Sequence, residues 1–284
     1  MSRDEEGGRK SEMNFLRKAI HGVFFRIKCL FEFIFFKTRF IYMRLRCRKT
    51  YAKLKQFKDI HKGERCFLIG TGPSLTDEDV LKLRGEYTFA VNSFIHACKR
   101  LDFYPTYYGE IDYDKFDLPE ILDNNKSTIF FTHRIDMPEK VYRRMDKKEN
   151  TFEFLMMEPG NWNYFSRHMP MPFSDDITRS IGWGYTVVYS MYQIIAYMGF
   201  SEIYVLGMDC SYSMDQDNYE DHYTKEARET VTSWGEVVNN FIKSHTEACR
   251  VFKTKGVKVY NTTRGGRLEV FPRVDLDAVL QVND

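Results

Sequence analysis

The sequence lacks three features that would each assign it to a common class of protein. Its six cysteines form no Cys-x-x-Cys pair and have no histidine partner at zinc-site spacing, which argues for reduced thiols and against a disulfide scaffold. The first apolar stretch is broken by cations and no small-residue cleavage site follows it, so no cleavable signal peptide is expected. Within the apolar stretch from Phe15 to Arg48, the longest run without Lys or Arg, Cys29 to Phe36, is far shorter than the about 20 apolar residues of a membrane-spanning helix.

Charge is divided unevenly along the chain. Residues 1–60 hold 16 Lys and Arg against 6 Asp and Glu, and the remaining residues hold 26 against 34, although the net charge is only +2. Apolar residues make up 43% and charged residues 29% of the chain, which excludes wholesale disorder. We therefore expect a basic N-terminal segment joined to an acidic globular body.

The basic segment has the pattern of a helix that lies on a membrane surface. At 100° per residue its apolar side chains form a broad arc, made of Leu16, Ile20, Val23, Ile27, Leu30, Ile34, Ile41 and Leu45. Residues 1–14 are predicted to be disordered, and residues 15–58 to form a helix docked on anionic lipid. The alternatives are a helix packed on its own domain or on a second copy in a homo-oligomer, and a true span. Nucleic acid is not expected as a partner, because the phenylalanines would then face water.

The body, residues 59–284, alternates short apolar runs with helical patterns. The expected strands are Cys66–Ile69, Tyr87–Val91, Thr128–Phe131, Phe152–Met156, Ile203–Leu206 and Val257–Tyr260. A capping box at Thr76–Asp79 opens a helix that runs through Leu83, and longer helices are expected over 184–198 and 224–249. This alternation predicts an α/β fold, a Rossmann-like and mostly parallel sheet with helices on both faces. Residues 105–175 are expected to form a lid or insertion.

Three candidate binding segments follow expected strands, where ligands gather in open α/β sheets. The first is Gly70-Thr71-Gly72-Pro73-Ser74, whose glycines would let backbone amides approach a phosphate. It matches neither the dinucleotide fingerprint nor a Walker loop, and an ordinary strand-to-helix turn is the alternative. Asn92 follows the second strand and could read a base or sugar, or cap the next helix. Asp209 follows a later strand and could hold a ribose or a metal, or form a turn.

Two further segments carry polar groups suited to chemistry. Arg179 and Ser180 precede a glycine-rich helix start and would suit a phosphate or carboxylate, unless the glycines serve only close packing. The long polar loop from Ser211 to Tyr223 contains His222, whose imidazole is a candidate general base. The acidic residues of this loop lack the glycine of a calcium-binding loop, and a solvated loop with an incidental histidine is the alternative.

These segments together resemble a known family. Cys66–Leu75, Val91–Ser93, Ile203–Asp209, the His222 loop and Asn261–Arg273 are similar to the 6-hydroxymethylpterin diphosphokinase-like (MptE-like) proteins of bacteria and archaea, over roughly residues 62–275. The Gly-x-Gly-Pro-Ser-Leu loop, the Asn after the second strand and the Gly-x-Asp after a later strand also resemble the bacterial sialyltransferases of lipooligosaccharide synthesis.

The sialyltransferase resemblance implies a role for each matching residue. Gly70, Gly72, Ser74 and Asn92 would contact a CMP nucleotide. Thr71, Asp209, Arg179 and Ser180 are added to the expected nucleotide-binding residues on the loop patterns described above, and not on the resemblance. Tyr212 and Tyr219 would hold the departing phosphate, and His222 would deprotonate the acceptor hydroxyl. The loop between Asp209 and His222 is shorter here than in those enzymes, so the match of His222 and the tyrosines is approximate.

The function expected first is a glycosyltransferase of bacterial surface-polysaccharide assembly. It would use a nucleotide-activated sugar, CMP-linked by preference, a glycan or lipid-linked acceptor and no metal cofactor, at the cytoplasmic face of the inner membrane. The first alternative is a pterin-type diphosphokinase that uses ATP and Mg²⁺, with Asp209, Asp215 and Asp217 as metal ligands. The second is a membrane-tethered nucleotide-binding protein without catalytic activity, which would not depend on His222.

Overall fold

The architecture was analysed in a computed structural model that describes residues 3–111, 127–133, 149–157, 171–211 and 234–281. The chain forms two compact units, which are described separately. The first contains helix α1 (Arg3–Arg46), and the second contains a sheet and the helices around it.

Helix α1 differs from the sequence expectation at both ends. It begins at Arg3 rather than near residue 15, and it ends at Arg46 rather than at 58. Residues beyond it form α2 (Arg48–Ala52) and the 3-10 helix η1 (Lys53–Phe57), which belong to the sheet unit. Tyr51, Leu54 and Phe57 are buried there, and the Phe57 ring lies 5.1 Å from that of Phe131 and 4.6 Å from that of Phe152.

The apolar arc of α1 is exposed. All seven of its members whose side chains are described are exposed, and so are Phe24, Phe25, Phe31, Phe33, Phe35 and Tyr42. Within the part of the chain that the structure describes, no helix combines the length and apolar character needed to cross a membrane.

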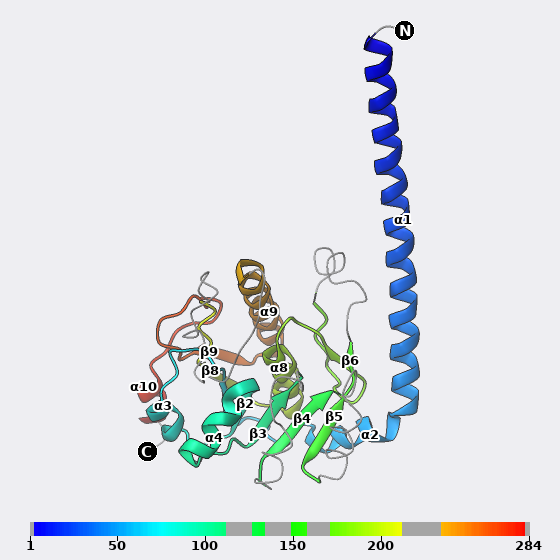
Figure 1. The fold of residues 1–284 in the computed structure, drawn as a ribbon. Coiled ribbons are helices and arrows are strands. Elements are labelled where there is room, and N and C mark those ends of the chain that lie inside the picture. Colours follow the sequence, from blue (N-terminus) through cyan, green and yellow to red (C-terminus); the bar gives the residue numbers. More distant parts are fainter. Residues whose placement is uncertain (1–2, 112–126, 134–148, 158–170, 212–233, 282–284) are drawn as a thin grey trace. The chain divides into compact units, whose positions relative to one another are not determined.

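The sheet unit confirms the predicted α/β fold, with a parallel sheet of seven strands (Figure 1). The strand order is β5-β4-β3-β2-β1-β8-β9, and every pairing is parallel. The strands are β1 (Arg65–Ile69), β2 (Thr88–Val91), β3 (Tyr107–Glu110), β4 (Ile129–His133), β5 (Thr151–Phe154), β8 (Glu202–Leu206) and β9 (Lys258–Asn261). The expected strand over 152–156 divides, because Met156–Met157 (β6) leaves this sheet and pairs with Ile181–Gly182 (β7).

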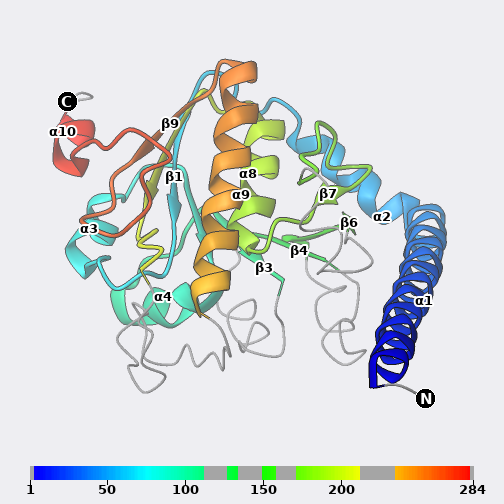
Figure 2. The ribbon, with the colours of Figure 1, turned by 90° about the horizontal axis from the view of Figure 1, so that it is seen from above.

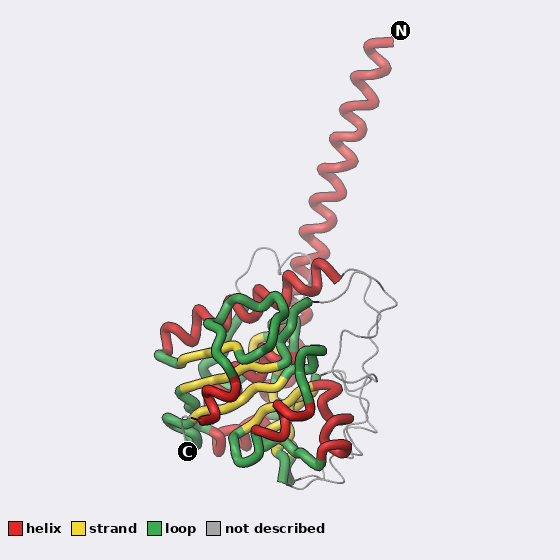
Figure 3. The backbone as a smooth tube through the Cα atoms, turned by 90° about the vertical axis from the view of Figure 1, so that its left-hand side faces the viewer, coloured by secondary structure: helices red, strands yellow, loops and turns green. Residues whose placement is uncertain are grey.

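Helices cover both faces of the sheet, as Figure 2 shows. On one face lie α8 (Val187–Met198) and α9 (Trp234–Lys255), over a core that includes Leu68, Val91 and Val205. On the other lie α3 (Asp77–Lys82), α4 (Ile95–Leu101, after the 3-10 turn η2, Asn92–Phe94) and α10 (Leu276–Gln281). Figure 3 shows the strands of the sheet lying side by side.

The strand order predicts a ligand-binding crevice between β1 and β8. From β1 the chain builds outward through β2 to β5, and it then returns to the other side of β1 with β8. The register pairs Ile69 with Leu206, so the loops that begin at Gly70 and Gly207 leave the sheet side by side. Such a reversal of strand order is where open α/β sheets bind ligands.

Three of the seven strands come from residues 105–175. Strands β3, β4 and β5 pair within the sheet, so these parts of the stretch are integral to the domain and are not a lid. Strand β3 was not expected from the sequence, because it is short and aromatic rather than aliphatic. The rest of the stretch, 112–126, 134–148 and 158–170, lies outside the described residues.

Candidate functional site

The glycine loop after β1 packs against the loop after β8. The amide of Gly70 donates to the carbonyl of Leu206 and that of Gly72 donates to the carbonyl of Gly207, each at 2.8 Å. A Cβ atom on Gly70 would lie 2.4 Å from Gly207 O, and one on Gly72 would lie 1.9 Å from Asp209 Oδ2. The glycines are therefore required for close approach of the two loops, and these two amides are already used. This corrects the expectation that they cradle a phosphate.

Asp209 is held at the centre of this contact. The hydroxyl of Ser74 donates to its Oδ2 at 2.8 Å, and the amide of Arg267 donates to its backbone carbonyl at 2.7 Å. The residue is only 7% exposed. Burial raises the pKa of the Asp209 carboxyl, and the bonds from Ser74 offset part of that rise. Ser74, expected at the ligand, instead positions this carboxylate.

Asn92 occupies a left-handed backbone conformation directly after β2, with φ of 51°. The hydroxyl of Tyr108 donates to its backbone carbonyl and accepts from the amide of Ile95, which fixes the turn. The side-chain Oδ1 of Asn92 is buried and has no hydrogen-bond partner among the described residues. It is thus an acceptor available to a ligand.

These loops line one pocket at the carboxyl edge of the sheet. The lining residues come from the loops after β1, β2 and β8, from the first turn of α8 and from α9: Gly70, Thr71, Gly72, Pro73, Val91, Asn92, Thr186, Val188, Gly207, Met208, Asp209, Cys210, Ser211, Phe241 and His245. Asp209 is the carboxylate of this set, and no Lys or Arg belongs to it within the described ranges. Burial raises the pKa of the Cys210 thiol to about 12. The thiol that lines the pocket is therefore protonated near pH 7 and is not a nucleophile.

His245 is a site residue that falls within the helix expected over 224–249 and that was not predicted to bind a ligand. It lies on α9, is 2% exposed and has Nδ1 3.0 Å from the hydroxyl oxygen of Tyr192 on α8. Burial lowers the pKa of the His245 imidazole to about 4, so it is neutral near pH 7. In the sequence, His245 occurs at the helical spacing of apolar residues. That pattern is equally typical of a histidine buried in a core, so it did not identify a site residue.

The predicted site residues are only partly brought together. Gly70, Thr71, Gly72, Asn92 and Asp209 meet at the pocket. Arg179 and Ser180 do not line it, and their amides bond to the carbonyl of Asp176 in a turn before β7. At the start of α8, the residue that lines the pocket in place of Arg179 and Ser180 is Thr186. Its hydroxyl caps the helix by accepting a hydrogen bond from the Val188 amide. Tyr212, Tyr219, His222, Asp215 and Asp217 lie outside the described residues.

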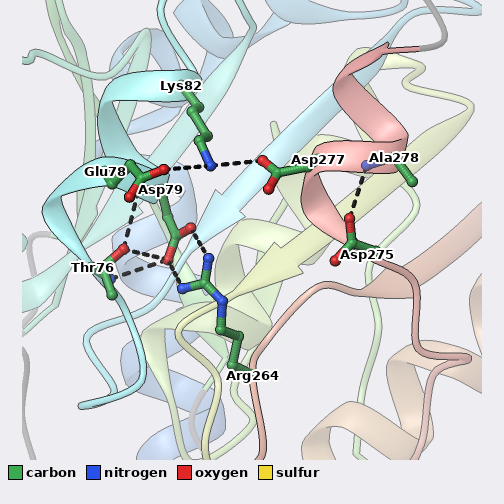
Figure 4. Close-up of polar contacts among 8 residues, drawn as sticks. All are labelled: Thr76, Glu78, Asp79, Lys82, Arg264, Asp275, Asp277 and Ala278. Carbon is green, nitrogen blue, oxygen red and sulfur yellow. Dashed lines mark hydrogen bonds and ion pairs between the residues drawn. The ribbon is translucent and has the colours of Figure 1, made fainter.

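The C-terminal stretch after β9 supports the pocket from outside. The hydroxyl of Thr263 accepts from the amide of Met208 at 3.1 Å, and a Cβ atom on Gly266 would lie 2.7 Å from Asp209 O. Arg264 forms a two-pronged ion pair with Asp79 on α3, as Figure 4 shows. Burial alone would raise the pKa of Asp79, but the bonds from Arg264 and Thr76 hold it below its ordinary value. This stretch joins the loop that carries Asp209 to the helix that follows the glycine loop.

Comparison with protein families identifies the family of the chain. The sequence model of the MptE-like family, described as 6-hydroxymethylpterin diphosphokinase MptE-like, matches residues 42–215, more than half of the chain. The chain belongs to this family. No curated protein matches the sequence at significant similarity.

The matched range contains the glycine loop, Asn92 and Asp209 of the MptE-like protein. It ends before His222, His245 and the stretch 261–273, so these belong to a part that the family match does not cover. The name of the family indicates transfer of a diphosphate group, a reaction that commonly requires Mg²⁺. Asp209 is a suitable oxygen ligand, but the described residues contain no group of three or more side chains able to hold a metal ion.

Proposed function

We propose that this MptE-like protein is a transferase that binds a nucleotide-activated donor in the pocket at the carboxyl edge of β1, β2 and β8. One observation carries the proposal: three strand-end loops and the first turn of α8, all remote in sequence, line a single pocket at the reversal of strand order. That is the position at which sheets of this architecture bind nucleotides.

The polarity of the pocket favours a donor with one phosphate. The strand-end loops supply acceptors, the Oδ1 of Asn92 and the carboxylate of Asp209, which suit the hydroxyls of a ribose. The first turn of α8 supplies the positive end of a 12-residue helix, which suits a phosphate. Lys and Arg, which commonly neutralise a triphosphate, do not occur among the described lining residues.

The first candidate activity is therefore glycosyl transfer from a CMP-linked sugar. The acceptor hydroxyl attacks the anomeric carbon and gives its proton to His222, while the bond from that carbon to the phosphate oxygen breaks and CMP leaves with the electron pair. Tyr212 and Tyr219 would stabilise the leaving phosphate. These three roles come from the resemblance to sialyltransferases, and the residues lie outside the described part of the chain.

The second candidate is the diphosphokinase activity that the family description favours. Here the hydroxyl oxygen of a pterin hydroxymethyl group would attack the β-phosphorus of ATP and lose its proton to solvent. The bond from that phosphorus to the α–β bridging oxygen would break, and AMP would leave with the electron pair. Asp209, with Asp215 and Asp217, would hold the Mg²⁺ that neutralises the phosphates. The described residues supply only the first of these carboxylates.

Helix α1 supports a site of action at a membrane. Its exposed phenylalanines and its cations together match the surface of an anionic bilayer, where apolar side chains enter the headgroup region and cations meet lipid phosphates. We propose peripheral attachment at the cytoplasmic face of the inner membrane, where a lipid-linked glycan acceptor would be presented.

Thermal unfolding of the full chain with CMP, UDP, GDP or ATP, each with and without Mg²⁺, distinguishes the candidates. Stabilisation by CMP without metal supports glycosyl transfer, and stabilisation by ATP only with Mg²⁺ supports the diphosphokinase. Stabilisation without turnover of any sugar or pterin acceptor would leave a nucleotide-binding protein. No response to any of the four nucleotides would contradict the proposal.

A further inference from the structure

Tyr192 determines which nitrogen of His245 carries the proton. Tyr192 is fully buried on α8, and its hydroxyl has His245 Nδ1 as its partner at 3.0 Å. If Nδ1 carried the proton and donated it, the buried O–H of Tyr192 would have no acceptor among the described residues. Since a buried donor without an acceptor is costly, the stable arrangement has Tyr192 donating to Nδ1. The proton of the neutral imidazole is then on Nε2.

The residue that carries this Nε2–H group, His245, lines the pocket. Its Nε2 has no hydrogen-bond partner among the described residues. Thr186 and Val188, from the first turn of α8, line the same pocket. The hydroxyl of Ser244 bonds to the carbonyl of Gly184, just before α8, and so ties the two helices together beside the site. A residue with a fixed N–H donor thus lines the pocket together with a helix N-terminus.

We propose that His245 donates a hydrogen bond from Nε2 to a phosphate oxygen of the bound nucleotide. The inference rests on the proposed function for the identity of the ligand, but the proton position does not depend on it. A neutral donor together with a helix N-terminus provides binding for one phosphate without a full positive charge. His245 is thus a ligand-binding residue, and Tyr192 is a positioning residue that acts through it.

The proton position is tested by long-range ¹H–¹⁵N NMR of the histidines in the full-length protein at pH 7. The His245 signals are assigned by their loss in His245→Gln. We expect the neutral form with the proton on Nε2, and a mixture of the two neutral forms in Tyr192→Phe. A proton on Nδ1, or a charged ring, in the wild type would overturn the inference.

The hydrogen bond is tested by titration of the same proteins with CMP. His245→Gln keeps an amide donor near the position of Nε2 and is expected to bind CMP within about threefold of the wild type, whereas His245→Leu should bind about tenfold more weakly. Thr246→Ala changes the neighbouring exposed residue on α9 and serves as the matched control. Equal binding by His245→Leu and the wild type overturns the inference. If the wild type binds no nucleotide, the proposed function fails together with this bond, while the NMR result still decides the proton position.

Discussion

Arg264 and Asp79, which are 185 residues apart in the chain, form an ion pair that joins the C-terminal stretch to helix α3. The carboxylate side of this pair is 6% exposed and the guanidinium side is 55% exposed. Asp79 also completes the capping box of α3 with Thr76. One buried carboxylate therefore both starts the helix after the glycine loop and anchors the stretch that packs on Asp209.

Arg264→Ala should lower the free energy of unfolding by about 1 kcal/mol, because the Asp79 carboxylate then keeps only its bonds with Thr76. The loss is modest because the Arg264 side chain is half exposed to solvent. Urea unfolding of the wild type and the variant measures the change. Lys82→Ala, which removes a cation from the exposed Asp277 in the same region of Figure 4, is the control and should have a smaller effect. A larger loss for Lys82→Ala would contradict the assignment of Arg264 as the anchor.

Gly72→Ala should disrupt the packing of the glycine loop against Asp209 in the pocket. The added methyl group would need the space of Asp209 Oδ2, so either the carboxylate or the loop must move. We expect a destabilisation of about 2 kcal/mol, typical of overpacking, and CMP binding at least tenfold weaker. Gly22→Ala, on α1 where a Cβ atom meets nothing within 4 Å, is the matched control. Normal CMP affinity in Gly72→Ala would mean that the ligand does not use this loop contact.

Ligand binding should depend on the ionisation of Asp209. Because burial raises the pKa of this carboxyl above its ordinary value, it takes up a proton at a higher pH than an exposed aspartate. Affinity for CMP should therefore fall as the pH is lowered towards that pKa, since the protonated form is a poorer acceptor for ribose hydroxyls. Asp209→Asn should bind weakly at every pH and show a flatter profile. Parallel pH profiles for the two proteins would exclude Asp209 as the titrating group.

Stability should fall in mild acid because of His245. Its pKa is lowered to about 4 in the folded protein from an ordinary 6.5, so its contribution is fully present above pH 6.5 and is lost as the pH falls towards 4. The difference corresponds to about 3 kcal/mol. Urea unfolding of the wild type and His245→Gln at several pH values isolates the contribution of His245 to the free energy of unfolding, because the other titrating groups are common to both proteins. If the gap between the two proteins stays constant from pH 7 to 4, the imidazole is not held neutral by burial.

The membrane proposal predicts that the exposed phenylalanines of α1 hold the protein on lipid. Phe24, Phe31 and Phe35 are 67%, 69% and 62% exposed and lie on one side of the helix. Changing all three to Ser should reduce co-sedimentation with anionic liposomes by more than tenfold. A second variant, with Lys37, Arg39 and Arg44 changed to Gln, should lose binding to anionic but not to zwitterionic liposomes. Unchanged sedimentation of the phenylalanine variant would refute docking by this face.

The sequence alone was enough for much of the sheet. The apolar runs at 66–69 and 203–206 became the paired strands β1 and β8, and the Thr76–Asp79 pattern became the capping box of α3. Strand β3 was missed because Tyr107-Tyr108-Gly109-Glu110 is too short and too aromatic to stand out from a loop. The N-terminal helix was predicted, but its end was not, because Tyr51, Leu54 and Phe57 continue the helical spacing while they pack on the sheet unit.

What the sequence by itself determined is local: alternating strands and helices, a basic helix with an apolar arc, and polar residues placed directly after strands. Periodicity and turn chemistry act over a few residues, so they can be recognised without the fold. Only the tertiary structure decided that the amides of Gly70 and Gly72 donate to the carbonyls of Leu206 and Gly207. It also decided that Arg179 does not line the pocket, and that His245 lines it and is bonded to Tyr192. Those relationships depend on strand order and register, which bring together residues from opposite ends of the chain.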